Sequence, residues 1–210
     1  VSQLLTPANQ LTILRMAFIP AFVILVVYNQ LGWAFAIFLL AGITDGLDGL
    51  MARLLHQKTT LGALLDPIAD KLLLVSTFIP IFLISHRGFE SEYIPVWGPL
   101  PVWVLIVIFG REAFITVFRS YAASRGVIIA AGKAGKRKTL LQFLFAGGLL
   151  LWYPMSMLAT AQTWEGLGWT LFKGFLTTWS GVTLALAILM TIYSMLDYLW
   201  SYRSLVVFRS

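Results

Sequence analysis

The sequence contains no cysteine and little charge, since only 11% of its 210 residues are Asp, Glu, Lys or Arg. The absence of cysteine excludes disulfides, thiolate nucleophiles and cysteine-based zinc or iron–sulfur sites. Ordinary globular domains carry about 25% charged residues, whereas this chain is 59% hydrophobic and has a mean hydropathy of +0.85. The composition therefore indicates a protein whose surroundings are largely a lipid bilayer.

Six apolar runs are long enough to cross a bilayer core, which needs about 20 helical residues. They lie at Leu11–Tyr28, Trp33–Leu55, Gly62–Ser85, Pro99–Tyr121, Thr139–Met157 and Leu171–Trp200. We predict an all-α integral membrane protein with six transmembrane helices, forming a single catalytic domain over residues 1–210. Residues 1–10 are expected to lie along the membrane interface, and the first thirty residues lack the pattern of a cleaved signal peptide.

The positive charges predict how the chain is oriented. If the six spans alternate, both termini and two of the loops share one side, and of the 15 Lys and Arg residues only Arg87 and Lys173 fall on the other. Basic residues are enriched on the cytoplasmic side of membrane proteins. Both termini are therefore predicted to be cytoplasmic, and the basic excess is explained without nucleic acid as a partner.

Acidic residues cluster at the cytoplasmic ends of the second and third spans. Of the nine acidic residues, four lie within one stretch: Asp45, Asp48, Asp66 and Asp70. Ionisable side chains within membrane spans are energetically costly and mark candidate functional sites. Spacings of three and four residues put each pair on one helical face. For Asp66 alone, an alternative is a helix N-cap followed by Pro67 at the first helical position.

Four carboxylates in a poorly solvated place repel one another and require protons or cations. A ligand set made only of oxygen favours a hard cation, so we predict two divalent cations, Mg²⁺ or Mn²⁺, with Ca²⁺ as a competitor. Such a pair of metals suits phosphoryl transfer. Gly49, Ala52 and Gly62 leave room near the backbone, although small residues in membrane helices also serve packing. Arg53 adds a positive charge suited to phosphate.

These residues resemble the signature of the CDP-alcohol phosphotransferase family. The signature is Asp45-Gly-Leu-Asp48-Gly49-Leu-Met-Ala52-Arg53, then eight residues, Gly62, three residues, Asp66, three residues and Asp70. The resemblance implies transfer of a phosphate-linked lipid group from a CDP-activated donor to an alcohol, with release of CMP. It also implies a homodimer in the cytoplasmic (inner) membrane of a bacterium, with the active site facing the cytoplasm.

The same resemblance implies a role for each residue of the signature. Asp45, Asp48 and Asp66 are expected to bind metal, and Asp70 to border the second metal and act as general base on the acceptor hydroxyl. The cytidine and the phosphates of the donor are expected to lie against Gly49, Ala52, Gly62 and Arg53.

Basic residues in the second half of the chain address the acceptor. Arg111 and Arg119 lie within or at the end of an apolar run, so we expect both to be more buried than the other cations and to need an anionic partner. Lys136 and Lys138 open the fifth span, where a basic loop residue also fits the general cytoplasmic excess of positive charge. Glu112 is expected to orient one of the arginines.

With Asn9, Leu11, Thr12 and Arg15, the basic cluster resembles family members that use CDP-diacylglycerol and sn-glycerol 3-phosphate. The resemblance implies that the acceptor phosphate is held by Arg111, Arg119, Lys136 and Lys138. An inositol phosphate or phosphatidylglycerol as acceptor would satisfy the same positive charges.

Two functions of other classes also fit clustered acids in a membrane. A cation transporter is disfavoured because the acids lie at the cytoplasmic end of the spans, beside Arg53, which would oppose cation conduction. A catalytically inactive lipid-binding scaffold is disfavoured because the signature is complete.

Overall fold

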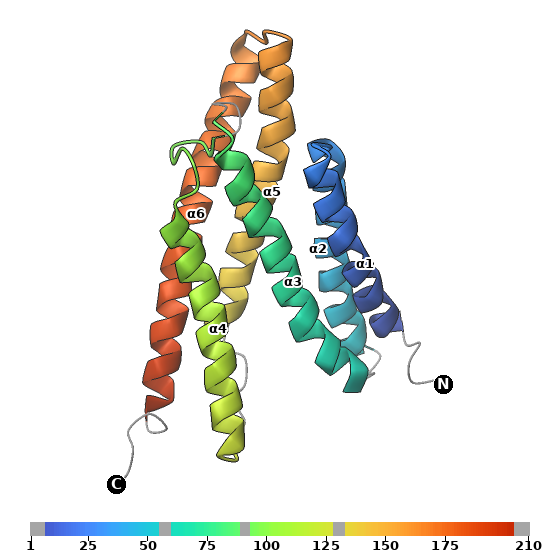
Figure 1. The fold of residues 1–210 in the computed structure, drawn as a ribbon, viewed down its shortest axis with the longest axis vertical. Helices are drawn as coiled ribbons and strands as arrows, with labels where there is room; N and C mark the ends of the chain where they lie inside the picture. The colour runs from blue at the N-terminus through green and yellow to red at the C-terminus, as the bar shows by residue number, and fades with distance from the viewer. Residues whose placement is uncertain (1–6, 55–59, 89–92, 128–132, 204–210) are drawn as a thin grey trace. The chain divides into compact units, whose positions relative to one another are not determined.

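The computed structural model describes residues 7–54, 60–88, 93–127 and 133–203, and within these it leaves the side chains of 7–9, 48–54, 60–64, 66 and 133–134 undescribed. Six helices make up nearly all of these residues (Figure 1). Their bounds are α1 Pro7–Val27, α2 Leu31–Leu54, α3 Thr60–Ser85, α4 Val102–Ser124, α5 Lys133–Ala161 and α6 Leu167–Ser201. The predicted all-helical architecture is confirmed for the described residues.

Four stretches within the helices are both long and apolar enough to cross a membrane: Gln10–Val27, Pro67–Ser85, Gly135–Ala161 and Leu167–Ser201. In α2 the apolar stretch Leu31–Leu47 is shorter, and α4 carries three charged residues, Arg111, Glu112 and Arg119, within its 23 residues. The chain is thus a multi-pass membrane protein by helix length and composition. Six spans and cytoplasmic termini stay predictions.

One alternative at a helix boundary needs correction. The helix α3 begins at Thr60, so Pro67 lies inside it and Asp66 is not an N-cap. A proline inside a helix removes one backbone hydrogen bond. Helices of membrane proteins tolerate this loss because neighbouring groups satisfy the freed backbone carbonyl. At the N-terminus, α1 begins at Pro7, where the fixed φ of proline suits a first helical turn. Residues 7–10 therefore belong to α1, and the rest of the expected interfacial segment lies outside the described residues.

The chain divides into two compact units. Unit 1 comprises Val1–Glu92 and Ala146–Trp164, and unit 2 comprises Tyr93–Phe145 and Glu165–Ser210. The helix α5 contributes its first half to unit 2 and its second half to unit 1. The prediction of a single catalytic domain stays a prediction.

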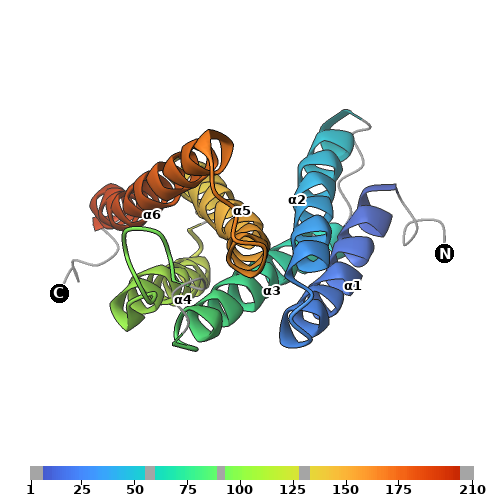
Figure 2. The same cartoon turned by 90° about the horizontal axis from the view of Figure 1, so that it is seen from above.

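In unit 1, α1 packs against both α2 and α3, as the view from above shows (Figure 2). The buried face of α1 follows a three-and-four spacing through Thr12, Arg15, Ile19, Phe22 and Val26. This spacing is the helical repeat that keeps one stripe of side chains against a neighbouring helix. Arg15 is therefore the one charged residue in this stripe, whose later members Ile19, Phe22 and Val26 are apolar.

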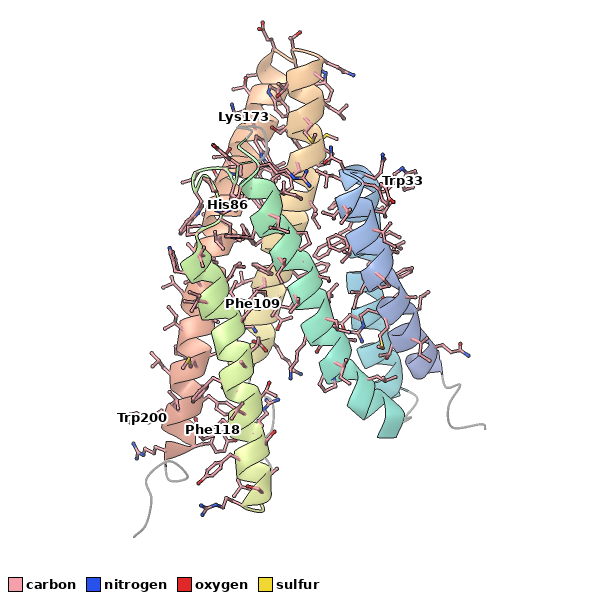
Figure 3. The ribbon with its side chains drawn as sticks, viewed as in Figure 1. Trp33, His86, Phe109, Phe118, Lys173 and Trp200 are labelled. Carbon is pink, nitrogen blue, oxygen red and sulfur yellow. The ribbon has the colours of Figure 1, made fainter. Side chains whose placement is uncertain are left out.

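In unit 2, α4 packs against α6 through a small aromatic and aliphatic cluster. Phe118, labelled on α4 in Figure 3, meets the ring of Tyr198 on α6 edge-on, with 5.6 Å between the ring centroids. Ile115 is buried in the same cluster. Near the end of α6, Trp200 is exposed, as expected for a tryptophan at a membrane interface. The cluster fixes the polar residues of α4 relative to those of α6.

Candidate active site

The signature residues in unit 1 lie on α2 and α3. The helical backbone of α2 carries Asp45 and, one turn later, Asp48, and that of α3 carries Asp66 and, one turn later, Asp70. The side chains of Asp48 and Asp66 lie outside the described residues, as do those of Ala52, Arg53 and the backbone surroundings of Gly49 and Gly62. The described geometry of this site therefore rests on Asp45 and Asp70.

Asp45 and Asp70 converge on one cation, Arg15 of α1. The Nη1 atom of Arg15 donates a hydrogen bond to Oδ1 of Asp45 and another, at 2.9 Å, to Oδ1 of Asp70. The arginine side chain is 1% exposed, whereas the aspartate side chains are 47% and 61% exposed. The first and the last aspartate of the signature, from different helices, thus share one positively charged nitrogen.

The packing of α1 on α2 explains why Arg15 reaches Asp45. Phe22 and Phe38 face each other across the helical hairpin, with ring centroids 6.2 Å apart. Because the two helices are antiparallel, moving two turns back along α1 and two turns forward along α2 pairs the next residues of the same stripe. Those residues are Arg15 and Asp45, each seven positions from its phenylalanine. The aromatic contact therefore sets the register of the ion pair.

The donor set of this site fits a hard divalent cation. Two carboxylate oxygens from two helices already approach a common positive centre, and carboxylate oxygen is the ligand that Mg²⁺ and Mn²⁺ prefer. Among the side chains that the structure describes, no group of three or more acidic or histidine residues comes together. The fit therefore depends on the chemistry of the converging pair and on the two further signature aspartates one turn away on each helix.

The second candidate site, in unit 2, is a basic cluster around one acid. Oε1 of Glu112 accepts hydrogen bonds from Nζ of Lys138 and, at 3.0 Å, from Nη1 of its neighbour Arg111. The side chains of Lys138, Arg111 and Glu112 are 4%, 11% and 24% exposed. A buried ammonium is stable only with a close opposite charge. Glu112 on α4 supplies that charge to Lys138 on α5.

The expected burial of the two arginines is half right. Arg111 is mostly buried, and its Nε also donates to Oγ of Ser194 at 3.2 Å. Arg119 is exposed, and its Nε donates to the hydroxyl of Tyr198 on α6 at 3.2 Å. Lys138 is the most buried cation of this cluster, and Lys136 is exposed. Because Arg119 lies only five residues before the end of α4, its long side chain reaches the surface.

The structure brings Arg111 and Lys138 together on Glu112 but keeps Arg119 and Lys136 out of that ion pair, as judged from the described side chains. The expectation that Glu112 orients an arginine is confirmed. Sequence reasoning missed that Glu112 also holds Lys138, and it missed Tyr198 as the partner of Arg119. Neither partner could be identified from spacing, because both contacts join residues far apart in the chain.

A buried amide extends the polar side of unit 2 beyond Lys138. Gln142 lies one turn after Lys138 on α5, is 2% exposed, and its Nε2 approaches Oγ1 of Thr191 on α6 at 3.5 Å. Its Oε1 atom is buried without a hydrogen-bond partner. One signal for this residue is visible in the sequence, namely a glutamine at helical spacing from a lysine at the start of an apolar run.

A family profile described as CDP-alcohol phosphatidyltransferase matches residues 5–193 of the chain. The matched region includes α1 to α5, the complete signature and most of α6. The chain belongs to the CDP-alcohol phosphatidyltransferase family. It is therefore a transferase of phospholipid metabolism.

Relatives of this CDP-alcohol phosphatidyltransferase cover most of its length. A probable phosphatidylglycerophosphate synthase of Mycobacterium tuberculosis is 35% identical over 199 residues, which is 91% of this chain and 78% of the relative. A CDP-diacylglycerol–glycerol-3-phosphate 3-phosphatidyltransferase of Pseudomonas fluorescens is 35% identical over 179 residues, 82% of this chain and 84% of the relative. A putative cardiolipin synthase of Mycobacterium bovis is 30% identical over 203 residues, 96% and 81% of the two chains.

Proposed function

We propose that this chain transfers the phosphatidyl group of CDP-diacylglycerol to sn-glycerol 3-phosphate, forming phosphatidylglycerophosphate and CMP. The observation that carries the proposal is the convergence of Asp45 and Asp70, the first and last acids of the signature, on one cationic centre. The acceptor is supported by the names of the relatives from Mycobacterium tuberculosis and Pseudomonas fluorescens. We also propose that the reaction takes place at the cytoplasmic face of a bacterial inner membrane.

Four aspartates are proposed to hold two divalent cations, Mg²⁺ or Mn²⁺: Asp45, Asp48, Asp66 and Asp70. When bound, the cations neutralise the charge of the donor diphosphate and make its phosphorus electrophilic. The exposure of Asp45 and Asp70, at 47% and 61%, supports the proposal because their carboxylates are open to an incoming cation.

Asp70 is proposed to act as the general base. Its carboxylate takes the proton of the acceptor hydroxyl as the hydroxyl oxygen forms a bond to the phosphatidyl phosphorus. The bond between that phosphorus and the bridging oxygen breaks, and CMP leaves with the electron pair. The exposed Asp70 side chain satisfies the first requirement of this role, which is access to a substrate hydroxyl.

The donor is proposed to lie along the last turns of α2 and the first turn of α3. Three small residues, Gly49, Ala52 and Gly62, leave space for the cytidine next to the backbone. Arg53, on the same helix as Asp45, is proposed to contact the phosphates, because a guanidinium donates two parallel hydrogen bonds to phosphate oxygens.

The phosphate of the acceptor is proposed to bind to the basic residues of unit 2. Arg119 and Lys136 are the accessible members of the set, because both are exposed. Arg111 and Lys138 are held by Glu112, so a phosphate reaches them only by sharing them with that carboxylate. We therefore assign the direct contacts first to Arg119 and Lys136, with Arg111 and Lys138 providing the positive field behind them.

The test uses purified protein in detergent with CDP-diacylglycerol, Mg²⁺ or Mn²⁺, and radiolabelled glycerol 3-phosphate. Release of CMP and appearance of lipid-soluble label are expected together, and both are expected to stop when EDTA is added. CMP release only with phosphatidylglycerol would move the chain to cardiolipin synthesis, in line with the name of the Mycobacterium bovis relative. Release only with an inositol phosphate would likewise change the acceptor, and no CMP with any acceptor would contradict the proposal.

A further inference from the structure

Arg15 is among the largest fully buried side chains of the described residues, yet no role in the proposed reaction accounts for it. Burying a guanidinium is costly unless close opposite charges compensate the lost hydration. The two carboxylates that accept hydrogen bonds from Arg15 are both proposed metal ligands, on α2 and α3. The arginine therefore links α1, which lies outside the signature, to α2 and α3, which carry it.

The position of Arg15 is set by helix packing, not by flexible reach. It occupies the stripe that contains Ile19 and Phe22, and the Phe22 to Phe38 contact places it opposite Asp45. Thr12, one turn earlier in the same stripe, is also buried. The interhelical face of α1 thus turns polar towards the end where Arg15 meets the carboxylates, which ties Arg15 to the site.

We infer that Arg15 is a positioning residue, whose guanidinium is the cation that Asp45 and Asp70 share in the metal-free protein. The same nitrogen approaches one oxygen of each carboxylate, so it competes with divalent cations for those oxygens. Arg15 holds the two helices in a binding-competent arrangement without metal and lowers the affinity for the first cation. The competition part of this inference rests on the proposed function, and the holding part does not.

A merely structural ion pair makes a different prediction from a counter-ion that competes with metal. Loss of a structural pair would lower thermal stability equally with and without metal, and would leave metal affinity unchanged. Loss of a competing counter-ion lowers stability chiefly in the absence of metal, because bound cations then take over the neutralisation of the carboxylates. It also tightens metal binding, since a positive charge next to the site is removed.

The experiment compares wild type, Arg15→Gln and Arg15→Lys in detergent after removal of metal with a chelator. The control is Arg87→Gln, an exposed arginine of the same unit that donates to Asn29 and lies beyond the end of α3, away from the carboxylates. Thermal unfolding is followed without metal and with saturating Mn²⁺, and Mn²⁺ affinity is measured by calorimetric titration without substrates. None of these readouts depends on catalytic activity.

Without metal, Arg15→Gln is expected to melt about 4 °C below wild type. With saturating Mn²⁺, this difference in melting temperature between the two proteins is expected to shrink by at least about half. The dissociation constant of Arg15→Gln for Mn²⁺ is expected to fall at least about threefold. Arg15→Lys, which keeps the charge, is expected to lie between wild type and Arg15→Gln, and Arg87→Gln to match wild type. An unchanged or weakened Mn²⁺ affinity in Arg15→Gln would overturn the competition.

A second comparison keeps the holding role testable if Arg15→Gln does not fold. Arg15→Lys, Asp70→Asn and the double variant form a cycle measured without metal, and the effect of Arg15→Lys is expected to shrink when Asp70 is already neutral. Equal effects in both backgrounds would overturn the shared-cation role. Absence of Mn²⁺ binding by wild type would contradict the metal part of the proposed function and the competition, while the metal-free cycle still judges the holding role.

Discussion

In each of the two units, one charged side chain neutralises several side chains of the opposite sign. In unit 1 one cation, Arg15, lies among carboxylates, and in unit 2 one carboxylate, Glu112, lies among cations. The difference is which partner is buried. In unit 1 the single opposite charge is buried and the acids are open, whereas in unit 2 the cations Lys138 and Arg111 are more buried than the acid that holds them.

This difference separates residues that present charge from residues that support it. The open acids of unit 1 present negative charge to an incoming cation, and the buried Arg15 holds them while it competes for the same oxygens. In unit 2, Lys138 and Arg111 are paired with Glu112 and support the site. The exposed cations Arg119 and Lys136 present positive charge to a ligand. Burial thus predicts which substitutions change binding and which change stability.

The largest expected effect is the loss of transfer in Asp70→Asn. If Asp70 is the general base, its neutral amide cannot take the proton, and the rate of CMP release is expected to fall by about 100-fold to 10,000-fold. The measurement is CMP release at saturating substrates. Asp197→Asn is the matched control, because Asp197 is an exposed acid near the end of α6 in the other unit. If Asp70→Asn released CMP as fast as Asp197→Asn and wild type, Asp70 would not be the general base.

The next effect tests the supporting role of Glu112. Glu112→Gln leaves the buried ammonium of Lys138 without its carboxylate, and we expect a loss of about 1–3 kcal/mol in unfolding free energy, between the values for exposed and buried pairs. Thermal unfolding in detergent measures it. Adding Lys138→Met is expected to restore much of the loss, because the stranded charge is then gone. Additive losses in the double variant would show that the pair does not couple.

Much of the fold could be predicted from the sequence because a helix that crosses a bilayer needs a long apolar run, and such runs are visible directly. The predicted span Gly62–Ser85 agrees with α3, and only the alternative helix start at Asp66 was wrong. An Asp-Pro pair such as Asp66-Pro67 is typical of a helix start in isolation, but the helix begins at Thr60 and continues through the proline.

The site could be predicted only as a set of residue types at fixed spacing. Contacts between distant segments, such as Arg15 with Asp70 and Glu112 with Lys138, depend on which helices pack together and in which register. The spacing of the stripe from Thr12 to Val26 is visible in the sequence, and an arginine occupies one of its buried positions. That irregularity was the available signal for Arg15, and it indicates a buried charge without identifying its partner.

The presenting role of Arg119 predicts a smaller effect, confined to the acceptor. Arg119→Gln is expected to raise KM for glycerol 3-phosphate by about 10-fold or more, the range for loss of a hydrogen bond to a charged group. Tyr198→Phe removes the hydroxyl that accepts from Arg119 Nε and is expected to raise KM only a few-fold, because it misorients the guanidinium without removing it. KM for CDP-diacylglycerol should stay the same in both.

Arg125→Gln serves as the control for Arg119→Gln, since Arg125 is an exposed arginine that stacks on Tyr121 just after α4. The two variants lose the same charge from neighbouring places. A comparable rise of KM in both would mean that the acceptor senses the general positive field of this region and not a contact with Arg119.

The smallest effect is expected for Lys136→Gln. An exposed lysine at the start of α5 keeps most of its hydration, so its contact with a phosphate contributes about 0–1 kcal/mol, as exposed ion pairs do. KM for glycerol 3-phosphate is expected to rise about twofold to fivefold at low salt and to approach the wild-type value as salt screens the field. Arg137→Gln, at the exposed next position, is the control. A salt-independent rise of more than about 10-fold in Lys136→Gln alone would make Lys136 a direct, desolvated ligand, and the division between presenting and supporting cations in unit 2 could no longer be drawn from burial.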